Sequence, residues 1–200
     1  MRRTLFAIVV VLYFSTIYAQ SDRQLAKVDN YGGIRVFSYC EPAAEYEVLG
    51  DVSFAGSSEG FYTIGGMVFA SGTEQQYNEI RNALIISAVM ANRAVEGVII
   101  HPIKNKQGRA TMIKFKEGAE NTDLAYVSKK RDYYVFIDCR PINDYEFQGK
   151  RRCSDLVNGS SDNIIDGILR NTKNLSRNAN AIIVTFVTNG YDYAEAITLK

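Results

Sequence analysis

Residues 36–42 read VFSYCEP and residues 135–141 read VFIDCRP, so Val, Phe, Cys and Pro recur at an offset of 99 residues. The match continues beyond the two phrases, where Tyr46, Glu47 and Gly50 recur as Tyr145, Glu146 and Gly149. Farther along the chain the offset is 84, as in the pairs Leu84/Ile168, Val98/Ile182 and Ile113/Ile197. Self-similarity of this kind predicts a duplicated structural unit.

Each copy has the same expected order of elements. The repeated phrase is rich in β-branched and aromatic residues and predicts a strand. The segment that follows contains a glycine in both copies, Gly50 and Gly149, and predicts a second strand with a bulge. Apolar residues at helical spacing predict helices within residues 74–94 and 162–178, and two further strands follow each helix. We therefore expect an α+β protein of two tandem, pseudo-repeated ββαββ units, each a two-layer arrangement of helix on sheet.

The offsets also predict the domain limits. We expect a first α+β repeat over residues 20–116, a connector over 117–132 and a second repeat over 133–200. The change of offset from 99 to 84 corresponds to 15 extra residues in the first repeat, which we place in an insertion at 55–72.

The first residues predict a cleaved signal peptide. Arg2 and Arg3 precede a short apolar stretch, and Ala19 is a small residue at the expected end of the leader, which we place at 1–19. No later segment is apolar and long enough to cross a bilayer. We expect a secreted protein, periplasmic or at the cell surface.

The sequence resembles a group of small bacterial envelope proteins. The strand YEVLGDV at 46–52, an Ala-rich helix, an apolar strand and the closing pattern A-x-x-I-K-F-K at 110–116 are similar to those of YbjQ-like proteins and of the Rcs stress-sensor lipoprotein type. The resemblance implies the fold and the envelope setting of that group. It assigns no functional residue here.

Composition restricts the class of partner. The formal charge of +1 becomes −1 once Arg2 and Arg3 are removed, and a near-neutral surface argues against nucleic acid as the main partner. Acidic residues such as Asp138 and Asp144 are too scattered to predict a metal site, so we expect neither metal nor cofactor. An unknown envelope protein or a small ligand remains the expected partner.

Enzymatic activity is not expected. His101 is the only histidine, and no nucleophile motif accompanies it. We therefore expect a non-enzymatic interaction or ligand-binding module. A hydrolase acting on an envelope polymer and a structural accessory subunit are the alternatives.

Two stretches are candidate contact surfaces. The insertion combines Gly and Ser with aromatic and apolar residues, which favours a β-hairpin that contacts a partner or ligand; its candidate contact residues are Phe54, Phe61, Tyr62, Met67 and Phe69. A basic run in the second repeat is a candidate contact for an anionic partner; it comprises Lys150, Arg151 and Arg152.

The three cysteines, Cys40, Cys139 and Cys153, permit at most one internal disulfide. In a straight hairpin, Cys139 and Cys153 would lie farther apart than the roughly 7 Å limit between the Cα atoms of a disulfide. Cys40 and Cys139 occupy equivalent positions and could meet only near a pseudo-twofold axis. We expect that folding requires no disulfide.

Overall fold

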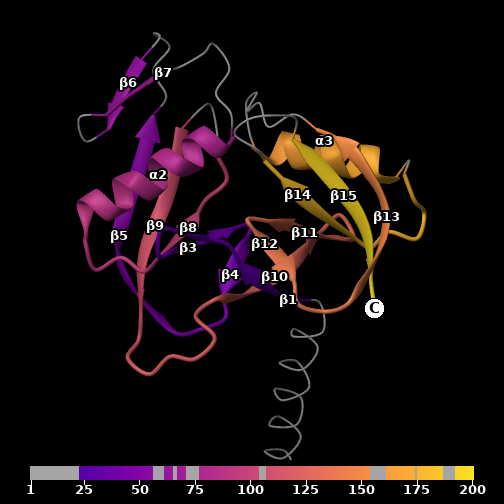
Figure 1. The fold of residues 1–200 in the computed structure, drawn as a ribbon, viewed down its shortest axis with the longest axis horizontal. Helices are drawn as coiled ribbons and strands as arrows, with labels where there is room; N and C mark the ends of the chain where they lie inside the picture. Colours follow the sequence, from indigo (N-terminus) through magenta and orange to yellow (C-terminus); the bar gives the residue numbers. More distant parts are fainter. Residues whose placement is uncertain are drawn as a thin grey trace, which may run out of the picture.

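Most of the described secondary structure is β-strand, and two α-helices interrupt the succession of strands along the described chain (Figure 1). The computed structural model describes residues 23–55, 61–64, 67–70, 77–103, 107–153, 161–173, 175–186 and 192–200. The elements of the first part of the chain are β1 (Arg23–Val28), β2 (Asn30–Tyr31), β3 (Ile34–Ser38), β4 (Cys40–Pro42), β5 (Tyr46–Ala55), β6 (Phe61–Ile64), β7 (Met67–Ala70), α2 (Tyr77–Ala91), β8 (Gly97–Ile100) and β9 (Gln107–Phe115). Those of the second part are β10 (Leu124–Lys130), β11 (Tyr133–Ile137), β12 (Cys139–Pro141), β13 (Tyr145–Arg152), α3 (Ser161–Lys173), β14 (Ala181–Thr185) and β15 (Tyr193–Leu199).

The expected fold class, α+β with two separate two-layer ββαββ units, is wrong. Among the described residues, 13 strands join in one mixed sheet, and only two short helices accompany them. The sequence interpretation missed the strands that join the two parts of the chain. β1 lies before the first repeated phrase, and β10 lies within the segment expected to be a connector.

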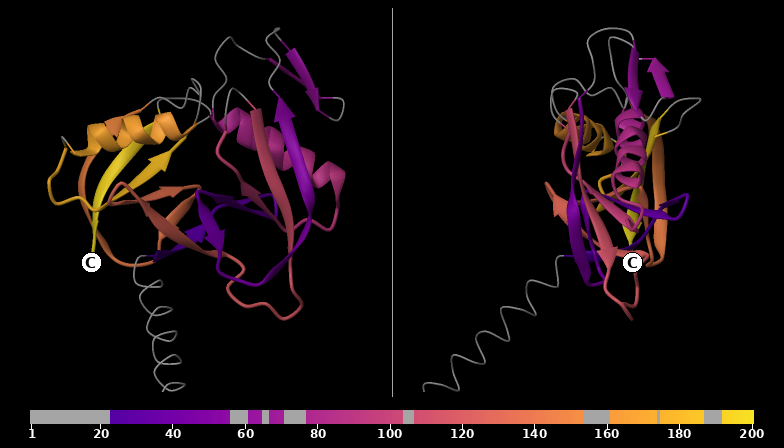
Figure 2. Two further views of the ribbon diagram at one scale, coloured as in Figure 1. Left: turned by 180° about the vertical axis from the view of Figure 1, so that it is seen from behind. Right: turned by 90° about the vertical axis from the view of Figure 1, so that its left-hand side faces the viewer.

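The main layer has a symmetric strand order. Reading across it, the strands are β5-β9-β8-β3-β11-β14-β15-β13, so equivalent strands of the two halves run outward from the centre. β3 is parallel to β8 and β11 is parallel to β14, and in each case the intervening helix makes the crossover. α2 and α3 pack against the same side of this twisted layer, because one buried cluster includes residues of both helices. Both helices lie above the central strands β3 and β11 in Figure 1, and Figure 2 shows the same arrangement from behind.

A second, smaller layer covers the centre on the side away from the helices. Its order is β4-β10-β1-β12, in which β4 pairs with β10 and β12 pairs with β1. Each half therefore supplies a strand to the other half's edge. This exchange joins the two halves in one sheet.

Residues related by the two offsets have equivalent backbone conformations. Tyr39 and Asp138, 99 residues apart, both have positive φ, at 58° and 54°. Gly50 and Gly149 have φ of 134° and 157°, and each lies at a register shift of its strand, which confirms the expected bulges. Only glycine adopts such values at little cost.

Equivalent hydrogen bonds repeat as well. In the first half the amide of Phe115 donates to Glu96 Oε2 at 2.8 Å, and in the second half the amide of Leu199 donates to Asn180 Oδ1 at 2.8 Å. These pairs are related by the offset of 84 residues. The correspondence supports a common origin for the two halves.

A pseudo-twofold axis relates the halves. Ala26 pairs with Ala125 and Ser38 pairs with Ile137, and in both pairs the partners are 99 residues apart. A residue can pair with its own equivalent only on a twofold axis. The axis therefore passes through both layers at the centre of the molecule.

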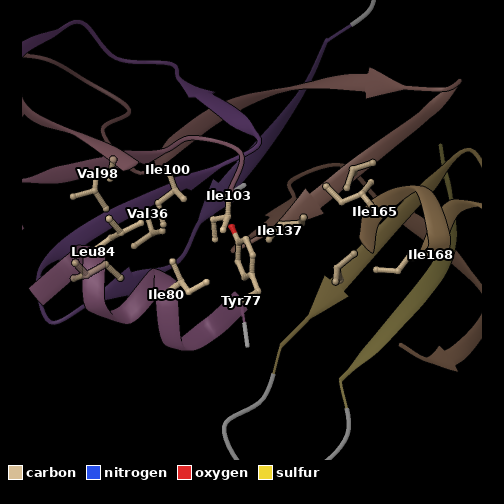
Figure 3. Packing of buried hydrophobic residues seen from close by; sticks show 14 of the residues in the cluster. Val36, Tyr77, Ile80, Leu84, Val98, Ile100, Ile103, Ile137, Ile165 and Ile168 are labelled. Carbon is tan, nitrogen blue, oxygen red and sulfur yellow. The ribbon is translucent and has the colours of Figure 1, made fainter. Parts of the chain in front are cut away.

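Two clusters of buried apolar residues lie on the two sides of the main layer. The helix-side cluster includes Leu84 of α2 and Ile168 of α3, and it is continuous between the halves. Figure 3 shows Tyr77, Ile103 and Ile137 between the residues of α2 and those of α3. The opposite cluster includes Ile113, Phe115 and Ile197, with Leu199 packed against it. The alternation of apolar residues along these last strands predicts this common facing.

The helices expected within 74–94 and 162–178 are confirmed as α2 and α3. The sequence also predicts a helix cap at Thr73 and a hairpin turn at Asn189-Gly190. Both lie outside the described residues, as does the expected signal peptide at 1–19. The domain limits expected from the offsets stay predictions. Neither α2 nor α3 has the length and apolar character that a membrane crossing requires.

Candidate functional site

The insertion contains the expected β-hairpin strands. β6 and β7 pair with each other in a two-stranded sheet outside the main one, at the upper end of the molecule in Figure 1. In their backbone register, Tyr62 is opposite Phe69, and Ile64 is opposite Met67. The side chains of the expected contact residues Phe61, Tyr62, Met67 and Phe69 lie outside what the structure describes.

Phe54 does not behave as an exposed contact residue. It lies near the end of β5, only 6% of its surface is exposed, and it belongs to the helix-side core. The correction follows from strand geometry, because side chains alternate between the two faces of β5 and Phe54 points to the face that α2 covers.

The basic run lies on an edge strand. Within the part of the chain that the structure describes, β13 pairs only with β15, and its residues Lys150, Arg151 and Arg152 are exposed. Lys150 is opposite Glu195 and Arg152 is opposite Tyr193. Glu195 lies between Ala194 and Ala196, which face α3, so Lys150 and Arg152 share the face that points away from α3.

Two aromatic side chains extend this basic face. Phe147 and Tyr145 are opposite Ile197 and Leu199, which lie on the side away from α3. Phe147 is 57% exposed and Tyr145 is 41% exposed. We call the row of Tyr145, Phe147, Lys150 and Arg152 the β13 face.

Among the described residues, three cations, Lys150, Arg152 and Arg140, and one carboxylate, Glu195, lie on or beside the β13 face. Glu195 lies 3.7 Å from Lys150 Nζ and 3.6 Å from a guanidinium nitrogen of Arg140, so two cations share one carboxylate. Lys150 Nζ also lies 3.1 Å from the centre of the Tyr193 ring, a cation–π contact. The face thus combines a net positive charge with aromatic rings.

The equivalent face of the first half lacks the two cations of the β13 face. The residues equivalent to the four members of the β13 face are Tyr46, Val48, Asp51 and Ser53. Asp51 replaces Lys150 and Ser53 replaces Arg152, while Glu41 replaces Arg140. The first half therefore offers an internal control for any property of the β13 face.

His101 lies in a chain of hydrogen bonds that does not suit nucleophilic catalysis. The hydroxyl of Thr111 donates to Asp51 Oδ1 at 2.7 Å, and His101 Nε2 lies 2.8 Å from the same hydroxyl. A nucleophile requires histidine to accept the hydroxyl proton while a carboxylate orients the histidine. Here the carboxylate accepts the hydroxyl proton instead. Burial and the nearby Arg109 lower the pKa of His101.

The most polar buried cluster lies at the axis, beneath the first turns of α2. Arg81 forms a buried ion pair with Asp138, and the Ser38 hydroxyl donates to Asp138 Oδ2 at 2.6 Å. Tyr31 donates to Asp138 Oδ1 at 3.3 Å, and Arg81 lies over the Tyr31 ring. Burial and the charge of Asp138 raise the pKa of Tyr31 to about 12.

This cluster joins the two halves and offers no binding space. The Tyr39 hydroxyl lies 2.5 Å from the Ser161 hydroxyl at the start of α3, and the Ser161 hydroxyl also accepts a hydrogen bond from the Ile103 amide. The small void lined by Tyr39, Tyr77 and Ser161 is too small to admit water. We interpret the cluster as structural. No group of three His, Cys, Asp or Glu residues able to hold a metal ion occurs in the described part of the chain.

The sequence interpretation found the cations of the β13 face but missed its aromatic residues and Arg140. The available signal was the alternation of Tyr145 and Phe147 along a strand, and the reversal of charge between positions 99 residues apart. It also missed Arg81 and Asp138, because nothing local marks a helix residue and a turn residue 57 positions apart as an ion pair.

Comparison with known proteins gives no relative. No family model, no curated protein and no solved structure matches the chain. The resemblance to YbjQ-like proteins and to the Rcs stress-sensor lipoprotein type stays a prediction.

Proposed function

We propose that the protein is a non-enzymatic binding module of the bacterial envelope and that its β13 face binds an anionic polysaccharide. The observation that supports this best is the row of two exposed aromatic rings and two cations on one face of an edge strand. Aromatic rings stack on the apolar faces of sugar rings, and lysine and arginine pair with carboxylate or phosphate groups.

The dimensions favour an extended polymer. Residues 145–152 span roughly 23 Å at the usual rise of a strand, so the four side chains would contact several consecutive sugars. The face is an open sheet surface rather than an enclosed pocket. An extended chain can lie along such a surface, whereas a small ligand would remain mostly in solvent.

A polysaccharide suits the geometry better than a membrane does. Tyr145 and Phe147 lie along the side of a strand, beside Lys150, and not at a protruding tip that would enter the apolar part of a bilayer. Anionic vesicles are therefore the comparison ligand in the test.

The test measures affinity for polygalacturonate, a polymer of uronic acids, by affinity electrophoresis at low and high salt. We expect retardation in polygalacturonate gels and none in gels of neutral dextran. Phe147→Ala should weaken binding about tenfold, as loss of a central aromatic contact does. Lys150→Glu should weaken it further at low salt.

The matched controls come from the first half. Val48→Ala and Asp51→Asn alter the equivalent positions and should leave retardation unchanged. Equal losses from Phe147→Ala and Val48→Ala would argue against the β13 face. Binding to phosphatidylglycerol vesicles without retardation by polygalacturonate would show that the ligand of the β13 face is a membrane and not a polysaccharide. Release of new reducing ends from the polymer would favour the hydrolase alternative.

A further inference from the structure

Two buried cysteines lie on either side of the pseudo-twofold axis, and the proposed function assigns them no role. Cys40 is the first residue of β4 and Cys139 is the first residue of β12. They are 99 residues apart and therefore equivalent. Cys40 pairs with Val127 of β10, and Cys139 pairs with Val28 of β1, so each lies on a strand that is exchanged between the halves.

Both cysteine side chains enter the same core. Cys40 is 7% exposed and Cys139 is 2% exposed, and both belong to the cluster on the side away from the helices. The on-axis residues Ala26 and Ala125 are in that cluster too. The two thiols interact with each other, and the contact with Cys40, together with burial, raises the pKa of Cys139.

We propose that Cys40 and Cys139 form a disulfide across the pseudo-twofold axis and thereby join the two halves covalently. The symmetry of the site favours the bond. A disulfide has its own approximate twofold axis through the middle of the S–S bond, and its torsion near 90° places the two Cβ atoms symmetrically about that axis. Two equivalent cysteines that meet on a molecular twofold axis present that arrangement.

Cys153 does not compete for this bond. It follows β13 and packs against the helix-side core, on the other face of the main layer. The odd number of cysteines is then explained by one pair at the axis and one thiol elsewhere. All three are in the reduced form in the structure.

The chemistry balances with an oxidant of the disulfide class, such as oxidised glutathione. One protein thiolate attacks the S–S bond of glutathione to give a mixed disulfide, and the second protein thiolate then displaces glutathione. Two protein S–H bonds and one glutathione S–S bond are lost, while one protein S–S bond and two glutathione thiols are formed. Because burial limits access to both thiols and raises the pKa of Cys139, exchange should be slow in the folded protein and faster during folding.

The test is to refold the reduced protein in a glutathione redox buffer, alkylate the remaining thiols and digest with trypsin. Trypsin separates the cysteines into peptides 36–81, 132–150 and 153–170. We expect peptide 36–81 linked to peptide 132–150, with peptide 153–170 alkylated. Alkylation of all three peptides, or a link that includes peptide 153–170, would overturn the proposal.

Stability provides a second measurement. Closing a loop of about 100 residues should raise the midpoint of thermal unfolding by roughly 5–15 °C over the reduced protein. Cys153→Ser should retain this difference between the oxidised and reduced forms. Cys139→Ser should abolish it, whatever its own stability. An oxidised form that unfolds at the same temperature as the reduced form would contradict the proposed disulfide.

Discussion

An ion pair lies near the start of each helix, and the cation and the carboxylate exchange places between the two pairs. Beneath α2 the cation is on the helix, at Arg81, and the carboxylate is on the turn between β11 and β12, at Asp138. At the start of α3 the carboxylate is on the helix, at Asp162, and the cation is Lys130 at the end of β10, with 2.6 Å between them. Asp138 and Lys130 are equivalent to Tyr39 and Tyr31, and each cation lies over one of these two rings: Arg81 over Tyr31 and Lys130 over Tyr39.

Burial separates the two ion pairs. The side chains of Arg81 and Asp138 are 6% and 4% exposed, whereas those of Lys130 and Asp162 are 29% and 41% exposed. Water can replace a lost partner in the second pair but not in the first. The comparison teaches that ion pairs near the starts of the two corresponding helices can differ widely in energetic importance, although neither pair uses residues equivalent to those of the other.

The largest expected effect is that of removing the buried cation. Arg81→Leu leaves the carboxylate of Asp138 buried without its countercharge, and we expect it to lower the free energy of unfolding by about 3–5 kcal/mol. Urea denaturation at pH 7 measures the change.

Lys130→Met is the matched control for Arg81→Leu. It removes the partly exposed cation, and water can solvate the carboxylates that remain, so the expected cost is at most about 1 kcal/mol. Similar losses from the two variants would show that burial does not separate the pairs.

Truncation of the two helices at equivalent core positions should have nearly equal effects. Leu84 is fully buried and Ile168 is 4% exposed, and both lie in the continuous helix-side core. We expect Leu84→Ala and Ile168→Ala each to cost about 2–5 kcal/mol, with a single cooperative transition. Thermal melts followed by circular dichroism measure this. Two separate transitions, or wild-type-like melting of either variant, would contradict a shared core.

Much of the local structure was predictable, because it depends on patterns of residues that are close in the sequence. The stripe around Leu84 predicted α2, and Gly50 and Gly149 predicted the bulges in β5 and β13. The fold class was not predictable in the same way. Strand exchange depends on pairs such as Ala26 with Ala125, and nothing in the local sequence of β1 or β10 indicates which partner each strand will choose.

The candidate site divides along the same line. Lys150 and Arg152 were found because they are adjacent in sequence, but their neighbour Arg140 reaches Glu195 from another strand. Phe54 was assigned to a contact surface because of the aromatic composition of the insertion next to it. Only the pairing of β5 with β9 shows that Phe54 points to the core. Side-chain direction requires the register of the sheet.

The insertion has no counterpart in the second half, so its removal tests whether the shared framework suffices. We expect that replacing residues 55–71 by a short Gly-Ser turn leaves a soluble protein with one cooperative transition, since changes of loop length cost only about 0.6 kcal/mol per doubling. Urea denaturation checks the stability, and collapse of the fold would show that the insertion is core structure.

The same variant distinguishes the two candidate contact surfaces. If the β13 face is the site, the shortened protein keeps its retardation by polygalacturonate. Loss of retardation in a folded shortened protein would instead assign the contact to the insertion and its aromatic residues, as expected from their composition.

The smallest expected effect concerns His101, whose equivalent in the second half is Thr185. The ordinary pKa of histidine is 6.5, and burial and Arg109 lower the pKa of His101 in the folded protein. The unfolded chain therefore binds a proton first as the pH falls. Its contribution to stability is complete above pH 6.5 and is lost progressively as the pH falls toward the folded-state pKa.

We expect this loss to disappear in His101→Gln, while the control Thr185→Ala should keep it. The measurement is the urea midpoint of each variant from about pH 7.5 to about pH 5.5, the range in which histidine titrates. Carboxylates that titrate at the lower end affect all variants alike, so the difference between His101→Gln and the wild type isolates the histidine. An unchanged slope in His101→Gln would mean that the pH dependence comes from other groups, and the asymmetry between the halves would then lie in the buried ion pair and the β13 face alone.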